Sequence, residues 1–419
     1  LIVTFLKQNR CCKQSTEGFR LHLSFVRHVF RACHFKKTAV VCAVSLASCG
    51  QKSSVPADVD AKSASLWPSK YAQGIRYLDD NLRNKAIVGD ETDRARRWRL
   101  NWNPGHCTNP KGPALQISTN LDTFDQGNAY WLSWLSIQAY RQVEATDQLH
   151  QMGLTRIDFI QEQSTSFQAF VASNSKYVIV SFAGTSDLTD YMTDVTFASK
   201  PEFFPGIPGR VHTGFLNVLE KSWPKVLALV REHSSAGQPI ILTGHSLGGA
   251  QAVISATRLA TLGFPVDSLY IYSVPRIGDE SYARHVSKLF PKRIYRFVNN
   301  EDVVPRLPPP RIAARNFSML FPEESREAVQ SVFETLSYTH VGSLLMQNAR
   351  GDLSAPREFS ESEDTDYWDT VVDRSRGRSV PAAVFANWRM LFDHIPFASH
   401  CQLKTPVASG FTQATDFLE

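Results

Sequence analysis

The segment Gly244-His-Ser-Leu-Gly-Gly249 constrains the fold more than any other part of the chain. It follows the apolar run 239–243, which is typical of a buried strand, and it leads into a helical pattern over 247–262. Between a strand and a helix, Gly-x-Ser-x-Gly predicts a sharp turn in which glycines let the backbone and the helix approach without a Cβ clash. The turn exposes the serine oxygen, and the helix N-terminus favours negative charge beside it. We therefore expect Ser246 to be a nucleophile.

Alternating strand and helix patterns extend on both sides of this turn. The predicted strands are 177–182, 239–243, 269–273 and 294–298, and the predicted helices are 129–143, 215–233 (interrupted or restarted at Pro224) and 247–262. Strands separated by helices of this length favour a mostly parallel sheet with helices on both faces. The expected fold class is α/β, of the α/β-hydrolase type.

A nucleophilic serine needs a base and a group that orients the base. In α/β-hydrolases these follow in the order Ser, Asp, His. The histidines far enough downstream are His340, His394 and His400, and the acids after the fourth predicted strand begin with Glu301 and Asp302. The order alone does not choose among them.

Over about residues 125–345 the sequence resembles the class-3 (fungal-type triacylglycerol) lipase family. Six segments match in family order: Phe182-Ala-Gly-Thr185, Val211-His-Thr-Gly-Phe215, Gly244-His-Ser-Leu-Gly-Gly249, Val274-Pro-Arg-Ile-Gly278, Asn300-Glu-Asp-Val-Val-Pro305 and Tyr338-Thr-His-Val-Gly342. One departure is Ala183, where the family usually has Arg.

The resemblance implies Ser246 as nucleophile, Asp302 as orienting acid and His340 as base, with Glu301 as a rival to Asp302. His394 and His400 are then interpreted as structural, and His245 as a packing residue.

The same resemblance implies an oxyanion hole made by the Leu247 N–H and by Thr185. It also places a lid between Thr185 and His212. The alternative for this stretch is a surface helix packed on the core.

The expected activity is hydrolysis of lipid carboxylic esters, as in triacylglycerol lipases, through an acyl-enzyme and without a cofactor. Phospholipase A1 or carboxylesterase activity on the same residues is the alternative among enzymes. The alternative from another class is a non-catalytic envelope lipoprotein that keeps the fold. No sequence pattern indicates a metal or nucleotide site.

The basic charge is concentrated in residues 1–48, which hold eight basic residues and one acidic residue in a chain of net charge +5. The rest is slightly acidic, so we expect no nucleic-acid partner. The apolar run 38–48 would rise only ~16 Å as a helix, about half the ~30 Å hydrocarbon core of a bilayer, and is typical of a signal peptide. Because no Met precedes Met152, we expect an upstream extension and a non-Met start before Lys36.

Leu46-Ala-Ser-Cys49 resembles a bacterial lipobox, which implies a lipid on Cys49 and a membrane anchor. By the rules of that family, Gly50 favours the outer membrane. A plain secretory signal that ends near a cysteine is the alternative. An exported chain can also join Cys107 to Cys401, although two separate buried thiols fit as well.

The chain divides into five expected segments. They are a leader (1–48), a lipidated tether (49–68), an N-terminal extension (69–124), the lipase-like domain (125–345) and a C-terminal extension packed on that domain (346–419). The sequence does not indicate an oligomeric state.

Overall fold

The computed structural model describes residues 117–118, 123–184, 199–201, 203–234, 237–321, 323–348, 352–358, 360–376, 390, 393–394, 400 and 403. Several predictions from the sequence lie outside these residues. They concern the leader and Cys49, the tether, Thr185, most of the lid segment, and the pair Cys107 and Cys401.

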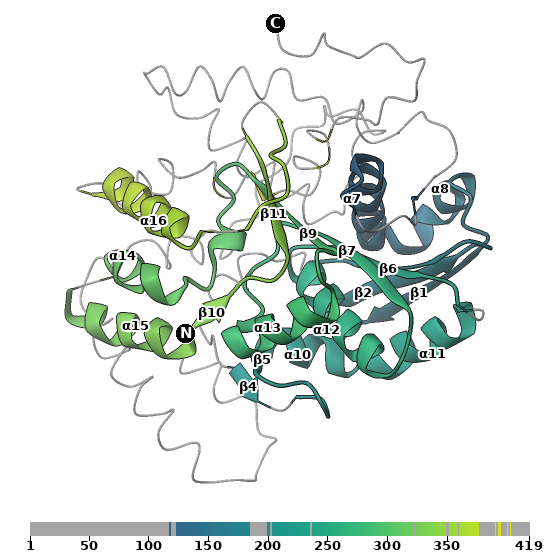
Figure 1. Ribbon diagram of the computed structural model, residues 1–419, viewed down its shortest axis with the longest axis horizontal. Coiled ribbons are helices and arrows are strands. Elements are labelled where there is room, and N and C mark those ends of the chain that lie inside the picture. The colour runs from purple at the N-terminus through teal and green to yellow at the C-terminus, as the bar shows by residue number, and fades with distance from the viewer. Residues whose placement is uncertain are drawn as a thin grey trace, which may run out of the picture.

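A seven-stranded sheet forms the centre of the molecule, in the order β1-β2-β3-β6-β7-β9-β11 (Figure 1). Its strands are β1 (Arg156–Glu162), β2 (Phe167–Ser173), β3 (Val178–Phe182), β6 (Ile240–His245), β7 (Val266–Tyr272), β9 (Ile294–Asn299) and β11 (Ser343–Gln347). The five strands from β3 to β11 are parallel, while β1, β2 and β3 pair antiparallel. The expected α/β fold with a mostly parallel sheet is confirmed.

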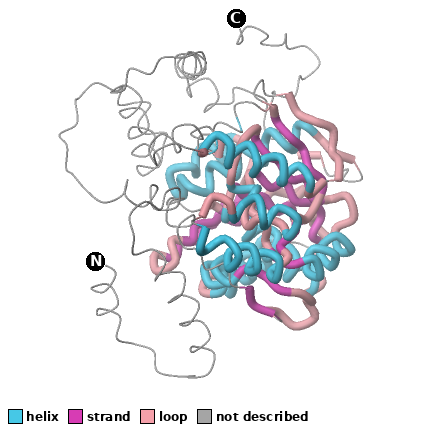
Figure 2. Tube along the Cα trace, turned by 90° about the vertical axis from the view of Figure 1, so that its left-hand side faces the viewer, coloured by secondary structure: helices cyan, strands magenta, loops and turns pink. Residues whose placement is uncertain are grey.

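Helices cover both faces of this sheet because successive strand residues point to opposite sides. In β3, Val178 and Val180 belong to one hydrophobic cluster and Ile179 to the other. Four helices pack on the first face: α10 (Thr213–Glu220), α11 (Trp223–His233), α12 (Leu247–Thr261) and α13 (Glu280–Leu289). The long helix α7 (Gln126–Arg141) packs on the second face, followed by η2 (Gln142–Ala145) and α8 (Thr146–Gln151). The turned view in Figure 2 shows the helices around the strands.

A smaller sheet and a third cluster lie beside the main sheet. The small sheet has the order β10-β8-β5-β4, from β10 (Tyr338–Thr339), β8 (Gly278–Asp279), β5 (Arg210–His212) and β4 (Ser199–Pro201). The third cluster joins η3 (Val304–Arg306), η4 (Arg311–Ala313), α14 (Ala314–Ser318), α15 (Glu323–Leu336) and α16 (Ser362–Ser375). Phe317 lies edge-on to Trp368, with ring centroids 4.8 Å apart, so α14 is packed against α16.

The predicted break at Pro224 is confirmed, since α10 ends before it and Pro224 lies in the first turn of α11. The strands β1 and β2 were not predicted. They form an antiparallel hairpin at one edge of the sheet.

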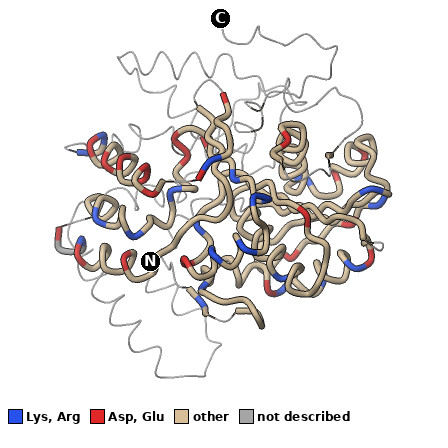
Figure 3. The backbone as a smooth tube through the Cα atoms, viewed as in Figure 1, with Lys and Arg blue, Asp and Glu red and all other residues tan. Residues whose placement is uncertain are grey.

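Figure 3 shows acidic and basic residues interspersed along the elements of the described part. Among the described residues, no helix combines the length and the apolar character needed to cross a membrane.

Candidate active site

Ser246 lies in the turn between β6 and α12, as the sequence predicts. Its backbone has φ 57° and ψ −129°, a conformation that costs an ordinary residue on the order of 1–3 kcal/mol. The Ser246 N–H donates to the Tyr272 carbonyl at 2.8 Å, so the turn is held by the neighbouring strand β7. The turn therefore presents the serine oxygen at the carboxyl end of β6.

Glycines make this turn possible by close approach. A Cβ on Gly248 would collide with the backbone of Phe182 and Ala183, which places α12 directly on the end of β3. A Cβ on Gly244 would collide with the backbone of Gly248. These positions accept no side chain because the obstructing atoms belong to the backbone.

Asp302 is buried in the loop that follows β9. Its Oδ1 accepts a hydrogen bond from the Val304 N–H at 2.9 Å, which fixes the carboxylate orientation. Its rival Glu301 points elsewhere, because both of its carboxylate oxygens bind Arg374, at 2.6 and 3.2 Å.

The histidine that joins these two residues is His394. Its Nε2 lies 2.9 Å from Ser246 Oγ, and its Nδ1 lies 2.9 and 3.0 Å from the two Asp302 oxygens. With Nδ1–H donated to the carboxylate, Nε2 is left as the acceptor that faces the serine hydroxyl. All three side chains are buried. In this geometry His394 can take the proton of Ser246, and Asp302 can stabilise the imidazolium that results.

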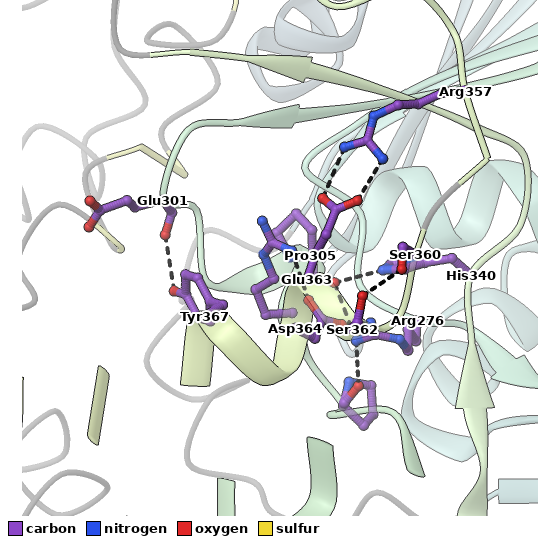
Figure 4. Close-up of polar contacts among 12 residues, drawn as sticks. Arg276, Glu301, Pro305, His340, Arg357, Ser360, Ser362, Glu363, Asp364 and Tyr367 are labelled. Atoms are coloured by element: carbon purple, nitrogen blue, oxygen red, sulfur yellow. Dashed lines mark hydrogen bonds and ion pairs between the residues drawn. The ribbon is translucent and has the colours of Figure 1, made fainter. Parts of the chain in front are cut away.

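The prediction that His340 is the base is wrong in this structure. His340 Nε2 instead donates to the Pro305 carbonyl at 2.8 Å (Figure 4). Its neighbour Gly342 packs against Ile294, the first residue of β9, so this segment lies near the amino end of that strand. Ser246 and Asp302 follow the carboxyl ends of strands parallel to β11, whereas His340 precedes β11.

The charges around His340 also make it a poor proton acceptor. Burial, followed by the nearby Arg296 and Arg276, holds the pKa of His340 well below its ordinary value. Burial together with Arg276 and Arg306 lowers the pKa of Arg296 to about 9. His340 is therefore a neutral hydrogen-bond donor in a buried, arginine-rich region.

The strand order contains the signal that would have found His394. In parallel α/β sheets, functional groups gather at the carboxyl ends of the strands. A base that meets Ser246 and Asp302 should therefore follow the last parallel strand, which leaves His394 and His400. His400 lies against α7, with its Nδ1 3.2 Å from Ser133 Oγ, and its structural interpretation agrees with this position.

The segment that carries His394, here called the His394 segment, is described at Met390, Asp393 and His394. It is bound to the loop after β9 that contains Asp302, here called the Asp302 loop. The Val303 N–H donates to the Met390 carbonyl at 3.2 Å. The Asp393 carboxylate accepts from Asn300 Nδ2 at 2.8 Å and from the Glu301 N–H at 3.1 Å. Asp393 was missed by the sequence analysis.

Helix α16 holds the other side of the same loop. The Tyr367 hydroxyl donates to the Glu301 carbonyl at 3.0 Å (Figure 4). Asp364 binds Arg306 at 2.8 Å and also pairs with Arg276, and all three side chains are buried. The Asp302 loop is thus fixed between α16 and the His394 segment.

Leu247 begins α12, where helix geometry gives the backbone N–H no acceptor within the helix. Gly184 lies beside the turn, since a Cβ on it would be 3.0 Å from Ser246 Cβ. Thr185 itself lies outside the described residues. The described part of the chain contains no cluster of three or more His, Cys, Asp or Glu residues suited to a metal ion.

Comparison with known families gives one match, over residues 179–312, to the family described as Lipase (class 3). The matched region runs from β3 to η4 and includes Ser246 and Asp302. It ends before His340 and His394. This part of the chain is class-3 lipase-like.

Curated relatives are similar to part of this chain. Secreted mono- and diacylglycerol lipase 1 of Fusarium solani is 36% identical over 154 residues, which are 35% of this chain and 44% of the relative. A lipase of Rhizomucor miehei is 34% identical over 144 residues, which are 32% of this chain and 39% of the relative. The chain thus spans less than half the length of these relatives.

Among solved structures, lipase II from Rhizopus niveus aligns with a TM-score of 0.41 and 20% identity. The alignment covers 53% of this chain and 82% of that one.

Proposed function

We propose that this chain, which matches the class-3 lipase family over residues 179–312, is a serine hydrolase that cleaves carboxylic esters of lipids. The observation that carries the proposal is His394, whose two ring nitrogens contact Ser246 and Asp302 inside a buried site. The relatives named as lipases support the choice of lipid esters.

The reaction follows from the hydrogen bonds. His394 Nε2 takes the Ser246 proton while Oγ attacks the ester carbonyl, and Asp302 stabilises the imidazolium that forms. The imidazolium then gives its proton to the leaving alcohol, and an acyl group remains on Ser246. Water, deprotonated by His394, releases the carboxylic acid and regenerates the serine.

The oxyanion formed in each step needs donors close to Ser246. The Leu247 N–H is one proposed donor, because α12 begins at this residue beside the serine. Thr185 is the second, supported by the position of Gly184 against Ser246. One such donor typically contributes about 3 kcal/mol to the stabilisation of the transition state.

The test compares the purified chain with its Ser246→Ala variant on a soluble short-chain ester, an emulsified triacylglycerol and a phospholipid. Hydrolysis of the emulsion that is lost in the variant supports a lipase. Cleavage of the phospholipid alone would replace this proposal by a phospholipase, and cleavage of the soluble ester alone by a carboxylesterase. If no ester is cleaved above the variant, and a fluorophosphonate leaves Ser246 unlabelled, the hydrolase proposal is refuted and the result favours a non-catalytic envelope lipoprotein.

We also propose that the chain is exported and anchored by a lipid on Cys49. Leu46-Ala-Ser-Cys49 after a short apolar run supports the anchor, and matching relatives named as secreted support export. Metabolic labelling with an alkyne fatty acid tests it, with Cys49→Ala as the control. Incorporation that is equal in both chains would contradict the anchor, and fractionation of the membranes tests the preference for the outer one.

The remaining segments are proposed as a tether over 49–68, an extension over 69–124, a catalytic domain over 125–345 and a packed extension over 346–419. For Cys107 and Cys401, thiol titration of the denatured protein with and without reductant distinguishes a disulfide from two separate thiols.

A further inference from the structure

Two consecutive backbone carbonyls in the His394 segment are each bound by a buried side chain. His245 Nε2 lies 2.8 Å from the His394 carbonyl oxygen. Asn299 Nδ2 lies 2.8 Å from the Asp393 carbonyl oxygen. Both donors are fully buried, so each bond is made away from competing water.

The tautomer of His245 is fixed by its two neighbours. Because Nε2 faces a carbonyl, it carries the proton, and Nδ1 accepts from the Tyr140 hydroxyl at 3.0 Å. Burial, followed by the proximity of His394, holds the pKa of His245 well below its ordinary value. A neutral ring at this place keeps the donor in position and adds no charge next to the imidazolium of His394.

The two donors come from the same strand ends as the other two members of the site. His245 is the last residue of β6 and directly precedes Ser246. Asn299 is the last residue of β9 and stands three positions before Asp302. Asp393 and His394 themselves belong to none of the strands that form the main sheet, so these contacts fix their position relative to the sheet.

We propose that His245 and Asn299 are positioning residues that dock the His394 backbone against the ends of β6 and β9. The proposal rests on the proposed hydrolase function. On this proposal His245 and Asn299 act together with Asp302 to hold the His394 ring at its contact distance from Ser246. A misplacement of about 1 Å in such a contact can reduce a rate by about 10²-fold.

Loss of docking has a consequence that differs from general destabilisation. Among the described residues, the titratable groups that contact the His394 ring are Asp302 and the neutral His245. A looser contact lengthens the hydrogen bonds that the ring makes with Asp302 and Ser246, so it slows proton transfer from the serine and leaves substrate binding nearly unchanged.

Paired substitutions separate the two bonds of His245. His245→Gln keeps a donor at the place of Nε2, whereas His245→Asn keeps only the group near Tyr140. Asn299→Asp replaces the amide donor by an oxygen of the same size. Thr243→Val is the matched control, because Thr243 is a buried residue of β6 whose hydroxyl faces the Tyr270 and Leu132 carbonyls, and among the described residues it makes no bond to Asp393 or His394.

The measurements are kcat and KM per fluorophosphonate-reactive site and the 1H NMR signal of the His394 Nδ1 proton, which reports its hydrogen bond to Asp302. We expect His245→Asn and Asn299→Asp to lower kcat by about 10–10²-fold at nearly constant KM and to weaken this proton signal. His245→Gln should recover most of the rate and the signal. Thr243→Val should leave kcat per site and the signal unchanged.

The proposal is overturned if His245→Asn and Asn299→Asp behave like Thr243→Val per reactive site. The NMR signal of the Nδ1 proton needs no turnover, so it decides the docking role even if the wild-type chain cleaves no ester. An inactive wild type whose proton signal is lost in His245→Asn and kept in Thr243→Val would refute the hydrolase function alone.

Discussion

His394 Nε2 lies 2.9 Å from Ser246 Oγ, although 148 positions separate the two residues in the chain. Ser246 belongs to the central sheet, while His394 belongs to a segment bound to the Asp302 loop through Asp393 and Met390. The site is therefore assembled from two strand ends and a segment outside the sheet, and each part can be tested.

Separate substitution of the two candidate bases, His394 and His340, gives the most direct test of the site. We expect His394→Ala to reduce kcat by at least about 10³-fold, because no other base contacts Ser246 among the described residues. His340→Gln keeps a donor for the Pro305 carbonyl and should retain kcat within about threefold. Initial rates of ester hydrolysis measure both, and the opposite order would restore His340 as the base.

Asp302→Asn should reduce kcat by about 10⁴-fold at neutral pH, since an amide cannot stabilise the imidazolium and favours the wrong tautomer. The amide oxygen can still accept from Val304, so the loop should keep its conformation. Circular dichroism checks the fold and steady-state kinetics check the rate. A loss below about tenfold would place the orienting acid elsewhere.

The glycines of the turn should respond differently to alanine. In Gly249→Ala the new Cβ collides with the Val274 side chain and lies 3.0 Å from the Gly244 carbonyl oxygen, and overpacking of this kind costs about 1–3 kcal/mol. Val274→Ala removes the obstructing methyl group and should restore part of the stability of the double variant. In Gly248→Ala the obstruction is the backbone of Phe182, so Val274→Ala should give no rescue. Urea unfolding of all four variants measures this, and equal rescue of both alanines would contradict it.

Asp364→Asn should destabilise the protein by about 3–5 kcal/mol, because it leaves buried arginine charge without its carboxylate. The neighbouring Glu363→Gln is the control on the same helix. Its partner Arg357 is partly exposed, and such pairs contribute about 0–1 kcal/mol. Thermal unfolding compares the two, and equal effects would mean that the buried charges are compensated in another way.

The free energy of unfolding should fall on acidification, partly because of His340. The folded protein holds this ring neutral, whereas in the unfolded chain the ring becomes protonated at about pH 6.5. The unfolded state therefore binds more protons below that pH. The stabilisation is present above about pH 6.5 and is lost by about 1.4 kcal/mol per pH unit below it. Urea unfolding between about pH 5 and about pH 6.5 should show a slope smaller by this amount in His340→Gln. An unchanged slope would mean that His340 is charged in the fold.

The central strands and helices could be predicted from the sequence because the spacing of apolar residues and the residue preferences of turns depend on neighbouring positions in the chain. The strand before Ser246, the glycine turn and the helix after it agree with the prediction within a few residues. The break at Pro224 was also found, since proline acts on its own helix.

The base was misassigned because its position depends on long-range order. Tyr338-Thr-His-Val-Gly342 matched a family segment, but that match contains no information on which end of β11 the histidine occupies. His394 has no recognisable flanking pattern. The bonds of Asn299 and Asn300 to Asp393, and of His245 to the His394 carbonyl, appear only after the sheet is assembled. Side chains that dock one segment on another are visible only in three dimensions.

The position of His394 far beyond the last strand also orders events during synthesis. A growing chain that has been translated only as far as β11 already contains Ser246, Asp302 and every strand of the main sheet. It still lacks the proton acceptor for the serine, so this nascent form would be chemically silent towards esters. Reactivity arises only when the ribosome has released the segment around His394 and that segment has docked.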